Sequence, residues 1–143
     1  MIYLRLPKEF IPQFEVVSCF FEFNDEILLL HRCSHKPEGD TWGIPAGKIE
    51  PNETPQQAIV REVFQETGCQ VFSNHLNYFQ KIFVKYPKYD FIYHIYHTVL
   101  EEKPSVRINS NEHQNFRWAN PDSALKMNLI RDEDVCIKLF YKA

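Results

Sequence analysis

The chain has 143 residues, 44% of them hydrophobic, and a formal net charge of −3. This size and composition predict a single domain over residues 1–143, with its own core and little room for a second one. The lysines and arginines are spread along the chain, which excludes a broad basic surface, so no stable nucleic-acid partner is expected. The four cysteines are far apart and form no C-x-x-C pair, so we expect buried thiols and neither a zinc ribbon nor a disulfide framework.

Membrane and export signals are not found in the sequence. No apolar run approaches the roughly 20 residues of a membrane span, and the first residues lack the charged start, apolar stretch and cleavage site of a signal peptide. We therefore expect a cytoplasmic protein without a membrane partner, either a monomer or a homodimer.

The first predicted elements are two strands, at residues 15–23 and 27–32, joined by a turn at residues 24–26. Both are apolar at consecutive positions, although a strand with one wet face would alternate. This pattern predicts a sheet that is covered on both faces.

The clearest predicted helix follows a loop that contains Gly47. Thr54 and Gln57 form a T-x-x-Q capping box, Pro55 suits the first helical position, and Gly68 suits a left-handed end. The helix is therefore expected between residues 54 and 68.

In the second half of the chain, a strand-like pattern predicts a long hairpin with strands at residues 76–86 and 89–100. A short strand follows at 114–118, then helices near 123–126 and over 132–141. Strands with helices able to cover both faces predict an α/β fold, specifically an α/β/α sandwich around a mixed β-sheet.

One face of the predicted helix is rich in oxygen ligands. Glu62, Gln65 and Glu66 lie three and four positions apart and so share this face. A solvated acidic surface is the simple alternative. However, the like charges of Glu62 and Glu66 repel each other unless a cation neutralises them, and oxygen donors suit Mg²⁺ or Mn²⁺ better than zinc.

The spacing of the segment from Gly47 to Cys69 resembles the Nudix box, G-x5-E-x7-R-E-U-x-E-E-x-G-U, where U is a bulky apolar residue. The anchors match at Gly47, Glu53, Arg61, Glu62, Val63, Glu66 and Gly68. The flanking strands extend the resemblance over most of the chain, and the run from residue 47 to 62 looks especially like the MutT branch.

The resemblance implies an Mg²⁺-dependent pyrophosphohydrolase, with Mn²⁺ also possible, in which water attacks a nucleoside diphosphate linked to another group. The small-molecule substrate would be a nucleoside triphosphate or a dinucleoside polyphosphate. Carried over by position, Glu62, Glu66 and the backbone carbonyl of Ala46 would hold the metal, and Arg61 would pair with Glu53 to brace the loop.

Gln65 is the main departure, because the family usually has glutamate at this position. Its amide oxygen can still coordinate a metal but carries no charge. The alternatives are an enzyme with altered metal demand, an enzyme with a displaced ligand, or a regulatory domain that binds nucleotides with weakened catalysis.

Three further residues are candidates through the resemblance. Glu112 lies where family members often place a catalytic base or an extra metal ligand; a solvated loop glutamate is the alternative, and Glu62 competes for the role of base. Tyr86 lies close to the sequence position at which dinucleoside polyphosphate hydrolases of the family carry a tyrosine. Asp132 lies where MutT-like proteins can touch the purine, with helix capping as the alternative.

Overall fold

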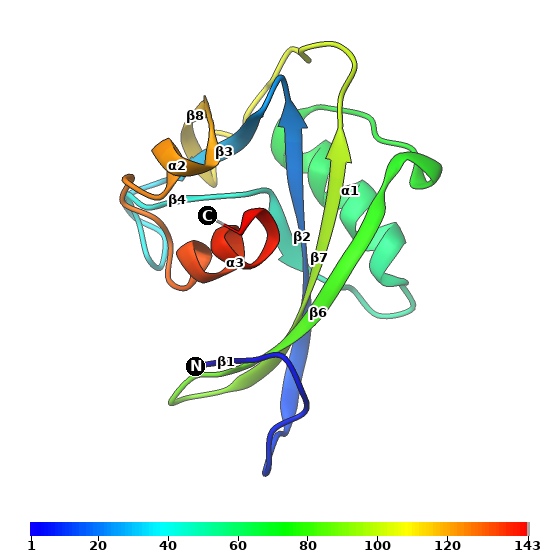
Figure 1. Ribbon diagram of the computed structural model, residues 1–143, viewed down its shortest axis with the longest axis vertical. Coiled ribbons are helices and arrows are strands. Elements are labelled where there is room, and N and C mark those ends of the chain that lie inside the picture. Colours follow the sequence, from blue (N-terminus) through cyan, green and yellow to red (C-terminus); the bar gives the residue numbers. More distant parts are fainter. Residues whose placement is uncertain (143) are drawn as a thin grey trace.

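A mixed β-sheet lies between helices in the computed structural model, which describes residues 1–142 (Figure 1). In the described chain its strands are β1 (Ile2–Tyr3), β2 (Pro12–Phe23), β3 (Glu26–Arg32), β4 (Trp42–Gly43), β5 (Ala46–Lys48), β6 (Asn77–Lys85), β7 (Asp90–Val99) and β8 (His113–Ala119). The helices are α1 (Pro55–Thr67), the 3-10 turn η1 (Ser73–His75), α2 (Pro121–Ala124) and α3 (Glu133–Tyr141). Ala143, the last residue of the predicted domain, lies outside the described residues, and the single-domain assignment stays a prediction.

The strand order is β1-β6-β7-β2-β3-β4, with β5 pairing with β2 and β8 pairing with β3. The long pair β2 and β7 is parallel, while the other pairs of the sheet are antiparallel. The predicted mixed sheet is confirmed. The short strands β1, β4 and β5 were not predicted, because two or three residues carry no readable period.

Two apolar clusters fill the two sides of the sheet. One lies beneath α1 and includes Val17, Leu28, Ile59 and Val63; the other lies beneath α3 and includes Ile82, Ile95 and Ile137. Figure 1 shows α1 and α3 on opposite sides of the long strands. The predicted α/β/α arrangement is therefore confirmed.

The caps of α1 fix its position along the sheet. Thr54 Oγ1 accepts a hydrogen bond from the Gln57 amide at 3.1 Å, and Gln57 Oε1 accepts one from the Thr54 amide at 2.9 Å. Gly68 ends the helix at φ 74°, and its amide donates to the carbonyl of Phe64. The predicted capping is confirmed. Phe64, which the apolar spacing of the helix would place beside Ile59 and Val63 against the sheet, is instead 48% exposed.

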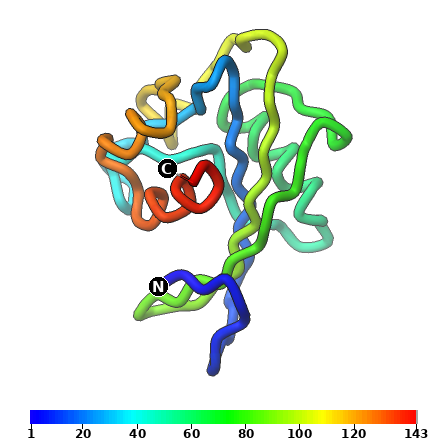
Figure 2. The backbone as a smooth tube through the Cα atoms, viewed as in Figure 1, coloured from blue at the N-terminus to red at the C-terminus, as the bar shows by residue number. Residues whose placement is uncertain are grey.

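The N-terminal segment runs beside the tip of the β6–β7 hairpin (Figure 2). There the Met1 ammonium donates to the Lys85 carbonyl at 2.6 Å. The four cysteines are free and buried, as predicted. Within residues 1–142, no helix combines the length and the apolar character needed to cross a membrane.

Candidate active site

Arg61 ties the loop after β5 to helix α1. Its Nε and one terminal nitrogen donate to the two oxygens of Glu53 at 2.7 and 2.8 Å, and that terminal nitrogen also donates to the Lys48 carbonyl at 3.0 Å. The two-point hydrogen bond to Arg61 lowers the pKa of Glu53 to about 2. Asn52 adopts the left-handed conformation that the loop requires, with φ 66°. Glu53 and Arg61 thus act as a brace.

Glu62 is pressed against Gly47. Its Oε1 accepts a hydrogen bond from Arg61 at 2.6 Å, and a Cβ atom added at Gly47 would lie 2.1 Å from the Glu62 carboxyl carbon. Only glycine leaves room for this carboxylate. Burial raises the pKa of Glu62, although the neighbouring guanidinium opposes that effect.

Glu66 is almost completely buried, with 6% of its surface exposed. Its Oε1 accepts one hydrogen bond, from the Ala46 amide at 2.9 Å. Burial raises the pKa of Glu66 well above its ordinary value, and the negative charges of Glu62 and Glu112 add to this effect. A buried carboxylate with acidic neighbours is stable in its charged form only when a cation compensates it.

A second chain segment brings more metal-ligand groups to Glu66. One ligand atom from each of Glu66, Glu112 and His113 lies within 4.8 Å of the other two. His113 is 7% exposed, its Nδ1 has no hydrogen-bond partner within residues 1–142, and burial lowers its pKa. This donor set of two carboxylates and a neutral imidazole fits a divalent cation. Sequence reasoning missed His113, although its place directly after Glu112 was a usable signal.

Gln65 and Ala46, which were predicted to bind the metal, make other contacts in the structure. Gln65 is exposed, and its Oε1 accepts a hydrogen bond from Arg61 at 3.2 Å. Ala46 contacts Glu66 through its amide. Metal binding by Gln65 and by the Ala46 carbonyl stays a prediction.

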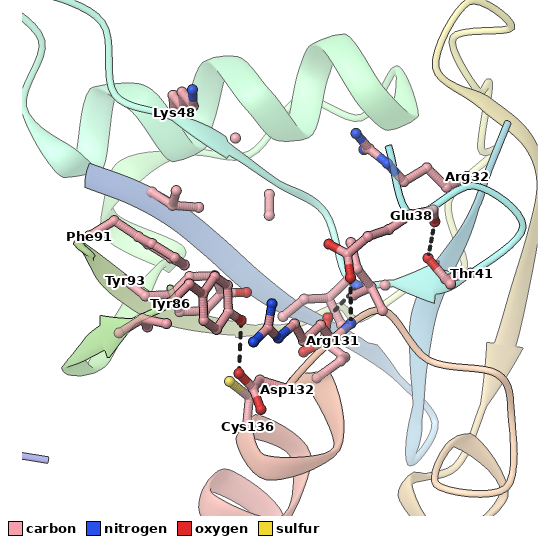
Figure 3. A pocket seen from close by; sticks show the side chains of 18 of the residues that line it. Arg32, Glu38, Thr41, Lys48, Tyr86, Phe91, Tyr93, Arg131, Asp132 and Cys136 are labelled. Atoms are coloured by element: carbon pink, nitrogen blue, oxygen red, sulfur yellow. Dashed lines mark hydrogen bonds between the residues drawn. The ribbon is translucent and has the colours of Figure 1, made fainter. Parts of the chain in front are cut away.

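A cavity of about 330 Å³ extends from Glu66 into an aromatic recess. Figure 3 shows the aromatic side chains of Tyr86, Phe91 and Tyr93 along it. Glu66 and His113 line one part; Tyr86, Tyr93 and Asp132 line another. The predicted substrate residues are thus brought together: the Tyr86 hydroxyl donates to Asp132 Oδ2 at 2.8 Å. The capping alternative for Asp132 is wrong for its side chain, which makes no capping bond although the residue precedes α3.

Glu133 is a buried acid in the same cavity that sequence reasoning missed. Its exposure is 4%, its Oε1 accepts a hydrogen bond from the Ile44 amide at 2.9 Å, and its Oε2 has no partner within the described chain. Burial raises the pKa of Glu133 to about 7. A usable signal was its spacing from Cys136 and Ile137, which share its helix face.

Cationic side chains border the cavity. Arg32 and Lys48 both line it, and Figure 3 shows them on the side of α1, away from Tyr86. Arg32 Nε donates to the Pro37 carbonyl at 2.7 Å, which holds its position. On the other side, the Arg131 guanidinium lies 3.9 Å from the centre of the Tyr86 ring. The cavity therefore combines acids, cations and aromatic rings.

The chain is similar to known proteins in sequence and in fold. It is 28% identical over 117 residues to the CTP pyrophosphohydrolase of Escherichia coli, covering 80% of this chain and 82% of that protein. It is 36% identical over 64 residues to the 8-oxo-dGTP diphosphatase of the same organism, covering 45% of this chain and 48% of that protein. The MutT protein of Methanosarcina mazei shares the fold with a TM-score of 0.74 at 21% identity, over 96% of this chain and 100% of that one. The model of the NUDIX domain matches residues 12–140, so the chain belongs to the Nudix family and is a Nudix hydrolase.

Proposed function

We propose that this Nudix hydrolase is a divalent-metal-dependent pyrophosphohydrolase of nucleoside or deoxynucleoside triphosphates, such as CTP or 8-oxo-dGTP. One observation carries the proposal: a single cavity joins Glu66 and His113 to an aromatic recess with a buried carboxyl group. A nucleotide has the same two halves, an anionic phosphate chain and a flat base with polar edges. The similarity to the CTP and 8-oxo-dGTP enzymes supports this substrate class.

The recess suits one base. The volume of the whole cavity, about 330 Å³, lies near the lower end of the roughly 300–1,000 Å³ typical of small-molecule sites. That size favours one nucleoside over the two of a dinucleoside polyphosphate. Tyr86 and Tyr93 would bound the base, and the free Oε2 of Glu133 would bond to its polar edge.

The carboxylate part of the cavity suits the phosphate chain. Glu62 and Glu66, with the Ala46 carbonyl, would hold Mg²⁺ or Mn²⁺, and the charged cluster described above explains why a cation is needed there. When bound, such an ion neutralises phosphoryl oxygens and orients them for attack by water. Arg32 and Lys48 supply further positive charge to the phosphates.

The attacking water needs a base within hydrogen-bond reach. Glu112 is half-buried, lies beside Glu66 and belongs to the β8 side of the cluster, so it would take the proton. Arg61 occupies one oxygen of the competing base, Glu62. The brace of Glu53 and Arg61 would keep the carboxylates of α1 in register with the loop.

The alternative of a nucleotide-binding domain without catalysis depended on Gln65. That side chain is exposed and bonded to Arg61, so its missing charge lies outside the buried group formed by Glu66, Glu112 and His113. Gln65 therefore does not support the hypothesis of a domain that binds nucleotides without hydrolysing them.

A substrate screen tests the proposal. The protein is incubated with CTP, dCTP, GTP, dGTP, 8-oxo-dGTP and a dinucleoside tetraphosphate, in Mg²⁺ or Mn²⁺, and the nucleotide products are separated by chromatography. We expect a nucleoside monophosphate and pyrophosphate from at least one triphosphate. Turnover of the dinucleoside compound alone, or of none of them with either metal, would contradict it.

A further inference from the structure

His113 is a buried imidazole that the proposed hydrolysis does not yet use. It opens β8, with an exposure of 7%. Buried polar atoms in proteins nearly always have a partner, and an unpaired one costs free energy. The Nδ1 atom of His113 has none within the described residues. The side chain is therefore short of one partner.

The backbone holds His113 firmly in its place. Its amide donates to the Asn109 carbonyl at 2.9 Å, and it pairs with Arg32 of β3 just after a shift in register. The neighbouring Gln114 side chain donates to the Arg32 carbonyl at 2.9 Å. The imidazole is thus presented to Glu66 by a fixed strand end and not by a free loop.

The distance between these groups is suited to a shared ion. Ligand atoms of His113, Glu66 and Glu112 lie within 4.8 Å of one another. Two ligands bound about 2.1 Å from one ion lie at most about 4.2 Å apart. Side-chain movements below about 1 Å would bring the imidazole and the Glu66 carboxylate onto one cation.

We propose that His113 supplies a nitrogen ligand to the metal held by Glu66, so that the site prefers a first-row transition dication such as Mn²⁺ over Mg²⁺. The inference rests on the proposed function, which requires a metal here. Mg²⁺ takes oxygen donors in a strict octahedron, whereas imidazole nitrogen binds transition dications. A nitrogen among carboxylates therefore shifts the selectivity of the site.

Pulsed electron paramagnetic resonance of bound Mn²⁺ tests the inference without measuring turnover. A directly bound imidazole nitrogen modulates the Mn²⁺ spin echo, and the modulation changes when histidine is labelled with ¹⁵N. We expect a nitrogen modulation in the wild-type protein, a changed frequency after ¹⁵N-histidine labelling, and loss of the modulation in His113→Gln. The exposed His35 offers a matched control, since His35→Gln removes a histidine from the loop after β3.

Competition between the metals gives a second measurement. The ratio of the Mg²⁺ and Mn²⁺ dissociation constants should fall by at least about tenfold in His113→Gln, the lower end of what loss of a supporting partner costs a metal site. The ratio should be unchanged in His35→Gln. Equal ratios in wild type and His113→Gln would overturn the inference.

The outcomes separate the two proposals. If Mn²⁺ binds to wild type and the echo has no histidine nitrogen, His113 is not a ligand and the proposed function stands. If Mn²⁺ and Mg²⁺ fail to bind, with and without a non-hydrolysable triphosphate, both proposals fail. The ¹⁵N measurement uses wild-type protein, so it decides the matter even if His113→Gln does not fold.

Discussion

The two ends of the cavity each contain a buried glutamate, and their surroundings differ. Glu66 comes from α1 and Glu133 from α3, on opposite sides of the sheet. Each accepts one backbone hydrogen bond from the same short segment, Glu133 from Ile44 and Glu66 from Ala46, both at 2.9 Å. Burial raises the pKa of both.

The neighbours of the two carboxyls are what separates them. Glu66 lies beside Glu62, Glu112 and His113, whose Nδ1 has no hydrogen-bond partner within residues 1–142. Near Glu133, the charge of Asp134 adds to the raised pKa, and Tyr93 and Cys136 lie close enough to Glu133 for its charge to raise their own pKa values. Equal burial is therefore compatible with two roles: the proposed cation would compensate the first carboxyl, whereas the second can stay neutral and bond to an uncharged ligand.

Among substitutions of the two buried glutamates, Glu66→Gln has the largest expected effect on nucleotide hydrolysis. It keeps the shape and the bond to Ala46 but removes the charge that holds the cation. We expect nucleotide hydrolysis in Mg²⁺ or Mn²⁺ to fall by roughly 10³-fold or more, because the metal supplies several kcal/mol of transition-state stabilisation. Release of pyrophosphate at saturating nucleotide measures it.

The matched control is Glu133→Gln, which makes the same replacement of a carboxyl group by an amide at the other buried glutamate. Its turnover number should stay within about threefold of wild type, since Glu133 lies away from the reacting phosphates. Equal turnover in wild type and Glu66→Gln would contradict the assignment of the carboxylate cluster.

The pH dependence of the free energy of unfolding tests the raised pKa of Glu133, the second of the two buried glutamates. Its pKa of about 7 lies above the ordinary value of about 4.3, so the folded state keeps a proton that the unfolded state releases. The stabilisation is complete below pH 4.3 and is lost as the pH rises to 7, by roughly 4 kcal/mol at 1.36 kcal/mol per pH unit.

Urea unfolding of wild type and Glu133→Gln between pH 4.5 and 8, without ligand, measures this loss. The difference between the two proteins cancels the contribution of Glu66, which both retain. A constant difference across the range would show that Glu133 has an ordinary pKa.

The KM of Glu133→Gln for nucleotides tests whether the recess binds the base. An amide in place of the carboxyl changes which hydrogen bonds the base edge can form, so KM for the preferred triphosphate should rise about tenfold, in line with about 1–1.5 kcal/mol for one hydrogen bond. Triphosphates with other bases should lose less. A uniform change across all bases would place Glu133 outside the base contact.

The sequence predicted the first of the two regions better than the second. Helix α1 carries its capping box, its final glycine and the acids of the Nudix box within one continuous segment, so local spacing defines them. The recess is assembled from distant segments: Glu133 meets Ile44 across 89 residues, and Tyr86 meets Asp132 across 46. Contacts of this kind depend on how α3 packs onto the sheet, and no local period records them.

His113 shows the same limit at shorter range. Glu112 was predicted as a candidate, but whether the next residue faces the cluster or the solvent depends on the register between β8 and β3. That register shifts between His31 and Arg32. A shift of one residue changes the face of a strand on which a side chain lies.

The smallest expected effect belongs to Gln65, the position where the chain departs from the family pattern. Gln65→Glu would restore the family residue, but the side chain is exposed and bonds to Arg61, which also bonds to Glu53 and Glu62. A carboxylate there only replaces the amide partner of a guanidinium that already pairs with Glu50, Glu53 and Glu62, and exposed charges interact weakly. We expect activity in Mg²⁺ to be preserved or raised, by no more than about threefold. The measurement is the turnover number of both proteins over a Mg²⁺ titration. A rise of a hundredfold, with tighter Mg²⁺ binding, would mean that position 65 reaches the metal when it carries a charge, and the division between the buried cluster and the exposed face of α1 would then be wrong.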